Sequence, residues 1–159
     1  MDTNPEILEL LDEATEIELN AARLYRDFAR AFPEDAVFWR QLPGEEHRHA
    51  ATLRSLRESF VPAGIFPESF LLSSLAELKA SNQSLREQLD DVSRFPKTRG
   101  EAIRTALGVA QRGGDFCFQS FVGSTGGTRI DQVFRALNEA DAQHAKRIAA
   151  YAEECGIPL

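Results

Sequence analysis

The amino-acid sequence predicts an all-α protein, built as an antiparallel four-helix bundle with one long crossover between the second and third helices. Apolar residues recur at spacings of three and four along four segments, which places them on one face of each predicted helix. The segments form two hairpins, at 4–59 and 99–155, joined by a long connection at 60–98. The hairpins share matched apolar stripes and a repeated acid-x-x-His unit. We therefore expect residues 1–159 to form a single domain.

The first predicted helix covers about 4–31. Asn4 followed by Pro5 is typical of an N-cap with proline at the first helical position. The apolar stripe of this helix also contains Glu18, an acid on a face that should be buried. Because burying an unpaired carboxylate is costly, Glu18 requires a partner in the interior.

The second predicted helix covers about 34–59 and follows the first after a very short link. The two helices should therefore be antiparallel neighbours. Pro43 and Gly44 interrupt this segment just before Glu46. Proline removes one helical hydrogen bond and clashes with the preceding turn, so we expect a kink or a break there.

The rest of the chain contains the long connection and the second hairpin. The connection at 60–98 combines a proline-rich apolar strap with one or two short helices, and it is long enough to leave helices two and three parallel. The third predicted helix covers about 99–122 and contains Gly113 and Gly114, a pair that is unusual in mid-helix. The fourth covers about 128–155 and ends at a glycine, which is typical of a helix C-terminus.

Two acid-x-x-His units carry the chemistry that the sequence suggests. Glu46 and His49 form one unit on the second helix, and Asp141 and His144 repeat the spacing on the fourth. Positions i and i+3 share one face of a helix, so each pair can bind a single ion. Carboxylate and neutral imidazole groups suit iron, manganese or zinc. One unit alone is a weak signal, but two matched units together with Glu18 favour a metal site.

This constellation resembles the ferritin-like di-iron carboxylate family, and within it the rubrerythrin-type proteins, over essentially the whole chain. In that family two helices each supply a glutamate, and two others each supply a Glu-x-x-His unit. The resemblance implies a ferritin-like bundle that holds one or two iron ions, with manganese or zinc as alternatives. The ligands that it implies are Glu18, Glu46, His49, Asp141 and His144, with Asp115 as a marginal sixth.

Two positions depart from the family's pattern. Asp141 replaces an expected glutamate; its side chain is one methylene shorter but can still ligate a metal. The glutamate expected on helix three falls on Gly114, and Asp115 is rotated from that position by about 100° on an ideal helix. Asp115 can substitute only if the adjacent glycines distort the helix, as a π-bulge would. The sequence leaves open one tightly bound metal, an unsymmetrical pair, or no lasting metal.

The resemblance implies an iron-dependent oxidoreductase that acts on O2 or peroxide, of the peroxidase or ferroxidase type. The chain has no Cys-x-x-Cys and hence no rubredoxin module, so turnover would need a separate electron donor. The alternative hypothesis is a non-enzymatic interaction or assembly module with a degenerate metal site, which Gly114 motivates. A third is a redox-inert ion, such as zinc, in a structural role.

Composition restricts the location and the partners. The net charge is −7 and the pI about 5.0, which argues against nucleic acid or an anionic membrane as the main partner. Two isolated cysteines and the lack of a leader-type N-terminus or a membrane-length apolar stretch favour a cytoplasmic protein. Ferritin-like chains of this length commonly dimerise or assemble further, so we expect a homo-oligomer.

Other polar residues near the units have simpler interpretations. Glu45 is next to Glu46 and should point elsewhere, toward solvent, and His47 should also be exposed. Glu13 and Glu16 flank the stripe of the first helix and should lie on its solvated face. For Tyr25, a hydrogen bond to a ligand carboxylate and plain core packing remain equally open.

Overall fold

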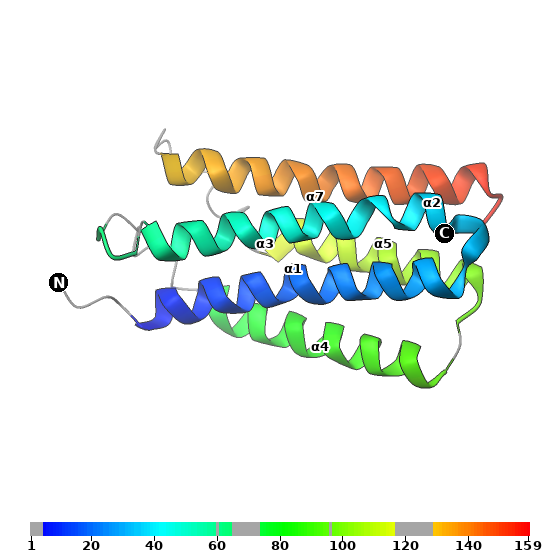
Figure 1. The fold of residues 1–159 in the computed structure, drawn as a ribbon, viewed down its shortest axis with the longest axis horizontal. Helices are drawn as coiled ribbons and strands as arrows, with labels where there is room; N and C mark the ends of the chain where they lie inside the picture. Colours follow the sequence, from blue (N-terminus) through cyan, green and yellow to red (C-terminus); the bar gives the residue numbers. More distant parts are fainter. Residues whose placement is uncertain (1–4, 60, 65–73, 96, 117–128) are drawn as a thin grey trace.

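The computed structural model describes residues 5–59, 61–64, 74–95, 97–116 and 129–159, apart from the side chains of 74, 113–116 and 131. All regular elements within these residues are helical. In chain order they are α1 (Pro5–Ala31), the 3-10 turn η1 (Pro33–Asp35), α2 (Ala36–Trp39), α3 (Gln41–Ser59), α4 (Ser74–Arg94), α5 (Arg99–Phe116) and α7 (Arg129–Glu154) (Figure 1). The prediction of an all-α chain is confirmed.

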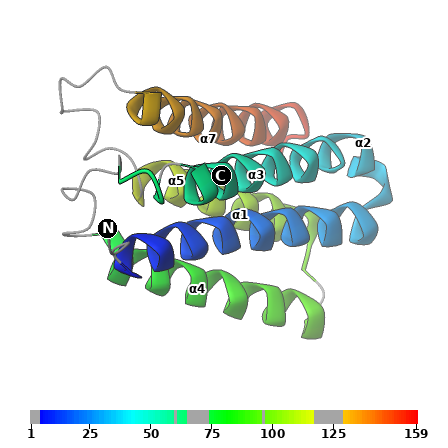
Figure 2. The ribbon, with the colours of Figure 1, turned by 60° about the vertical axis from the view of Figure 1, so that its left-hand side comes forward.

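The five long helices of the described residues, α1, α3, α4, α5 and α7, lie side by side along the longest axis of the molecule (Figures 1 and 2). α1 packs antiparallel to α3, and α5 packs antiparallel to α7. The chain passes through α4 between the two hairpins, so that α3 and α5 run in the same direction, as the long connection predicts. None of the helices in the described part of the chain is both long and apolar enough to cross a membrane.

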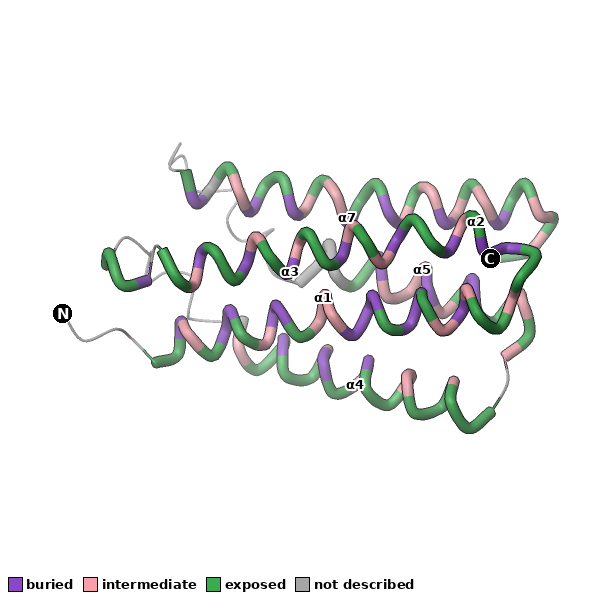
Figure 3. Tube along the Cα trace, in the orientation of Figure 1, coloured by how far each residue is buried: buried purple, intermediate pink, exposed green. Residues whose placement is uncertain are grey.

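The described part of the long connection contains one helix, which is long where one or two short helices were expected. α4 has 21 residues and lies along α1, on the side away from α7 (Figure 1). The buried side of α4 faces α1 (Figure 3). Leu78 and Leu85 are buried there, one in each of the two apolar clusters of the interior. Leucines at helical spacing, with the buried Asn82 between Leu78 and Leu85, give α4 one inward face. Its cover explains why α1 is buried on more than one side.

The expected break at Pro43 and Gly44 is wrong in its position. α3 begins at Gln41 and continues through both residues, and the interruption falls at Arg40, whose N–H donates to the Ala36 carbonyl at 3.0 Å. Pro43 is the third residue of α3. The N–H groups in the first turn of a helix have no partner within the helix, so the lack of one at Pro43 costs little.

Several predicted features lie outside the described residues. These are the N-cap Asn4, residues 60 and 65–70 of the proline-rich strap at 60–70, and the end of the predicted third helix beyond residue 116. The fourth predicted helix matches α7 to within a residue at each end.

The interior is divided into two apolar clusters along the axis. The first combines Leu11 of α1 with Leu53 of α3 and Phe134 of α7. The second combines residues nearer the other end of the same helices, including Phe28 and Trp39. One level lies between the two clusters on each of these helices. It falls between positions 14 and 21 of α1, between 42 and 53 of α3, and between 137 and 148 of α7.

A buried ion pair joins three elements at the end where α1 meets η1. The Asp35 side chain is fully buried, and it accepts hydrogen bonds from Arg99 Nε at 2.7 Å and from the Tyr151 hydroxyl at 2.5 Å. Tyr151 also stacks on Phe38, with ring centroids 4.0 Å apart. The hydrogen bonds from Arg99 lower the pKa of Asp35. Asp35 therefore links η1 to the first residue of α5 and to the last turn of α7.

We expect Asp35→Ala to lower the free energy of unfolding at pH 7 by about 2 to 3 kcal/mol, because it removes charge-assisted hydrogen bonds from a buried site. The folded-state pKa lies below the unfolded value. The contribution is therefore fully present above the unfolded pKa of about 3.9, and it disappears as the pH falls through the folded pKa. Urea unfolding of wild type and variant between pH 7 and pH 3 measures this difference.

Asp90→Ala is the matched control, since the Asp90 side chain is exposed and pairs with the exposed Arg94 at 3.7 Å. Its effect should stay within about 0.5 kcal/mol at every pH. Equal effects of the two substitutions at pH 7 would show that Asp35 does not hold these helices together.

Candidate metal centre

The level between the two apolar clusters is polar. Glu18 of α1, Glu46 and His49 of α3 and Asp141 of α7 each direct a potential ligand atom into it. These four atoms all lie within 4.8 Å of one another. The structure thus brings together four of the six residues predicted from the sequence, and they come from three helices.

His49 lies at the middle of this group. Its Nδ1 is 3.2 Å from Glu46 Oε2, 3.4 Å from Glu18 Oε2 and 4.0 Å from Asp141 Oδ1. The contact with Glu46 follows from the i, i+3 spacing on α3, which places both side chains on the face toward the interior. The side chains of these residues are between 4% and 13% exposed, so water screens the group poorly.

His144 adjoins the group through Glu46. Its Nδ1 lies 3.0 Å from Glu46 Oε1, and its side chain is 2% exposed. The rings of His49 and His144 stack with their centroids 5.5 Å apart. Five predicted residues therefore share one interior level, with both histidines directed at the same carboxylate.

Glu45 belongs to the site, and the prediction that it points away toward solvent is wrong. Its Oε2 lies 2.5 Å from His144 Nε2, and both of its oxygens accept hydrogen bonds from Arg147, at 3.0 and 2.9 Å. Neighbouring residues on a helix differ in direction by about 100°, and α7 lies on the side that Glu45 faces. One sequence signal pointed to this contact. Arg147 follows His144 by three residues, so α7 presents both on one face.

Burial and proximity shift the titration of the carboxylates in opposite directions. Burial raises the pKa of Glu18 well above its usual value, and it also raises the pKa of Asp141, with a further contribution from the charge of Glu46. Burial acts in the same sense on Glu46, but hydrogen bonds from His144 and His49 outweigh it and lower the Glu46 pKa. Glu46 is therefore the carboxylate that keeps its charge.

The histidines hold protons more tightly than usual. Burial alone would lower the pKa of His49, but its hydrogen bonds to Glu18 and Glu46 raise it to about 10. The pKa of His144 is also raised against the effect of burial, mainly by Glu46. Protons thus neutralise the buried carboxylates in the metal-free chain. A bound metal cation can replace them in this role.

Tyr25 lies in the core beside this group. It is 1% exposed and stacks on Trp39, with ring centroids 6.2 Å apart. Burial raises its pKa, and the charges of Glu46 and Asp141 raise it further, so the phenol stays neutral. The stacking favours the core-packing interpretation of Tyr25.

The predicted contribution of the third helix lies at the edge of the described part of the chain. The backbone of α5 stays α-helical through Gly113 and Gly114, without the π-bulge that would redirect Asp115. The side chain of Asp115 lies outside the described residues, so its role as a sixth ligand stays a prediction.

The remaining polar residues follow the simpler interpretations with one exception. Glu16 and His47 are exposed, as expected. Glu13 instead accepts a hydrogen bond from Asn82 of α4 at 2.8 Å, and Asn82 in turn accepts one from Asn20 at 2.8 Å. This polar chain joins α1 to α4. The sequence did not indicate it, because it did not indicate where α4 packs.

The structure establishes an all-α chain with a buried group of glutamate, aspartate and histidine side chains that could hold a metal ion. Comparisons of the chain with protein-family models, with curated proteins and with solved structures gave no match.

The protonation of His49 is directly measurable in the metal-free chain. We expect ¹⁵N-histidine NMR to show His49 as an imidazolium at pH 8, because its folded pKa is about 10. Glu46→Gln should lower this pKa by removing the charge that the ring faces.

Glu58→Gln, at the exposed end of the same helix, is the control and should leave the His49 titration unchanged. A neutral His49 ring at pH 8 in metal-free protein would contradict the charge distribution described above.

Proposed function

We propose that this chain is a ferritin-like metalloprotein of the rubrerythrin type. In this proposal α1, α3, α5 and α7 form one four-helix domain around a centre of one or two iron ions. The observation that carries the proposal is the group of Glu18, Glu46, His49 and Asp141, which converges from three helices at a single interior level.

The donor set fits such an ion in chemistry and in size. Carboxylates combined with imidazole suit iron and manganese, and zinc also accepts them. Ligand atoms on opposite sides of one ion lie about 4 Å apart when each bond is about 2.1 Å. The four donor atoms already lie within 4.8 Å of one another, so small side-chain movements can close them around an ion.

Binding at this level is an exchange of cations. His49 Nδ1 carries the proton that faces Glu18 and Glu46 in the metal-free chain. Histidine binds metal only as the neutral ring, so this proton must leave when the ion enters. The three carboxylates then face the ion instead of one another. The buried negative charge stays neutralised in both states.

Glu45 and Arg147 hold the second histidine in position. Glu45 takes the Nε2 side of the His144 ring, and Nδ1 is left facing Glu46. A carboxylate behind a ligand histidine fixes the ring's orientation and raises its basicity. Arg147 fixes the carboxylate of Glu45 through two hydrogen bonds. His144 therefore extends the donor set through one defined nitrogen.

Iron bound here would supply redox chemistry toward O2 or peroxide, with electrons from a separate donor, as the peroxidase or ferroxidase type requires. The residues of the chain hold and orient the ion and keep bulk water from it. Asp141, whose carboxyl has a raised pKa in the metal-free chain, would give up its proton when it binds the ion.

A non-enzymatic module with a degenerate site is the second candidate. It is favoured by the internal pairing of the group, since Glu46 contacts His49 at 3.2 Å and His144 at 3.0 Å without a metal ion. A structural zinc ion is a variant of this candidate. Both predict a stable fold without turnover.

Metal analysis separates these candidates. Protein purified from iron-supplemented cells should contain about one to two iron atoms per chain, and His49→Ala should fall below about 0.2 because the central donor is lost. His47→Ala is the matched control, because His47 is exposed on the same helix and should leave the content unchanged. Glu45→Gln should keep the stoichiometry but weaken the affinity about tenfold.

A metal content below about 0.2 per chain in the wild type, unchanged by His49→Ala, would refute the metal-centre proposal. If the iron-loaded protein reduces peroxide and oxidises Fe(II) no faster than background, the non-enzymatic module is favoured. Turnover that disappears in Glu46→Ala would decide for the oxidoreductase.

A further inference from the structure

A concave site lies on the surface at the end of α1, apart from the carboxylate–histidine group. It is a groove of about 470 Å³. Its lining residues are Arg26, Ala29, Arg30, Pro33, Ala36 and Arg40. The lining thus combines alanine and proline side chains with three arginines, which come from α1 and from the junction of α2 and α3.

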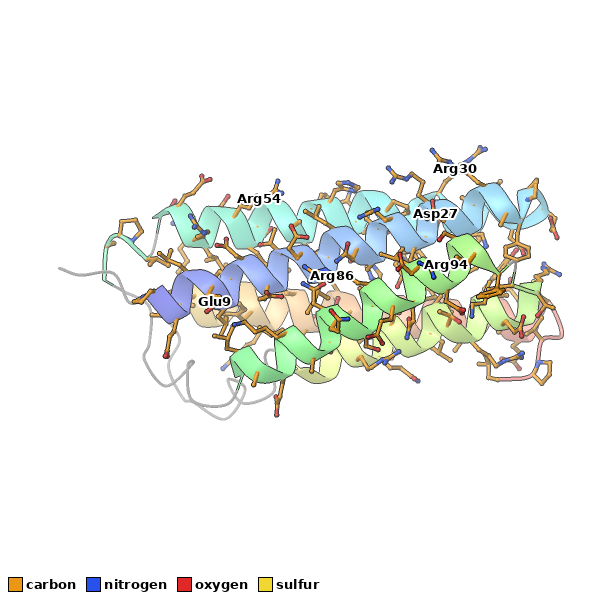
Figure 4. All side chains as sticks on the ribbon, turned by 90° about the horizontal axis from the view of Figure 1, so that it is seen from below. Glu9, Asp27, Arg30, Arg54, Arg86 and Arg94 are labelled. Carbon is orange, nitrogen blue, oxygen red and sulfur yellow. The ribbon has the colours of Figure 1, made fainter. Side chains whose placement is uncertain are left out.

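The groove is basic in a chain of net charge −7. None of the described residues that line it is acidic. Arg30 has one ion pair, with Asp27 at 3.8 Å, and both side chains are well exposed, at 74% and 40%. A pair so long and so exposed leaves most of the charge of Arg30 available. Figure 4 shows the Arg30 side chain extending away from the helices into solvent.

Helix geometry explains only one of the three arginines. Arg30 lies in the last turn of α1, where the free carbonyls favour a cation. Arg26 is four residues earlier on the same face, and like charges at i and i+4 destabilise a helix. Arg40 approaches the same groove from a different element. Three arginines line one groove without an acidic residue in the lining, which favours an anion as its ligand.

We propose that this groove binds a small phosphate-bearing anion. The planar guanidinium fork matches phosphate oxygens and can donate two hydrogen bonds at once. A concavity of several hundred cubic ångströms suits a compact ligand, whereas an acidic protein would dock on a flatter surface. The groove is separate from the carboxylate–histidine group, which lies two turns earlier on α1 at Glu18, so this inference does not depend on the metal centre.

Titration calorimetry with sodium pyrophosphate at low ionic strength tests the proposal on the full chain. We expect saturable binding of one pyrophosphate per chain, with a Kd on the order of 0.1 to 1 mM. Arg26→Gln and Arg40→Gln should each weaken binding about tenfold, because each removes a charge-assisted contact. Arg54→Gln is the matched control, an exposed arginine of α3 that lies well away from Arg30 along the molecule (Figure 4).

Chemical modification locates the site independently. Pyrophosphate should protect Arg26 and Arg40, but not Arg54, from an arginine-specific dicarbonyl reagent. The proposal is overturned if no saturable binding is found up to about 10 mM pyrophosphate. Above that concentration, ordinary surface charge would also attract the anion. Equal weakening by Arg54→Gln would also overturn it. So would tighter binding of a hexaglutamate peptide than of pyrophosphate, which would indicate an acidic protein partner instead.

Discussion

Neutralisation of buried carboxylate charge at one level of the interior is the constraint on which the rest of the structure depends. Glu18, Glu46 and Asp141 approach one another where little water reaches them. An isolated ionised carboxylate in such an environment costs many kcal/mol, so cations or protons must accompany the three. His49 and His144 supply that charge in the metal-free chain, and a metal ion supplies it in the proposed function.

The apolar clusters on either side hold this polar level in register. Leu53 of α3 and Phe134 of α7 pack on one side of it, and Leu42 and Ile148 of the same helices pack on the other. A shift of one helix by a single residue would rotate its apolar stripe out of both clusters at once. The burial of apolar surface therefore fixes the positions of the acid and histidine side chains. Without it, the carboxylates would repel one another and move out into water. At the end of the molecule, Asp35 connects the first hairpin to the second.

Much of this arrangement could be predicted from local patterns in the sequence. Glu18 within an apolar stripe and two acid-x-x-His units on other stripes are facts about helix faces, and a helix face is encoded by residue spacing. The all-α class followed from the same spacing. Spacing does not, however, encode which neighbour covers a given face. The position of α4 along α1 was missed for this reason.

The role of Glu45 was missed for the same reason, because it depends on how α7 lies against α3. The sequence predicts a break at Pro43 if this proline lies in the interior of a helix. In the structure the preceding turn ends at Arg40, so Pro43 lies in the first turn of α3 and the break falls before it. The role of Asp115 depends on the geometry around Gly114 and stays a prediction.

Anomalous X-ray diffraction at the iron edge, from crystals of the iron-loaded chain, tests the central claim most directly. The account predicts a peak about 2.0 to 2.3 Å from donor atoms of Glu46, His49 and Asp141, with the contact between His49 and Glu46 replaced by bonds to the ion. Crystals grown with excess iron that show no peak there, and in which His49 Nδ1 still donates to Glu46, would contradict it.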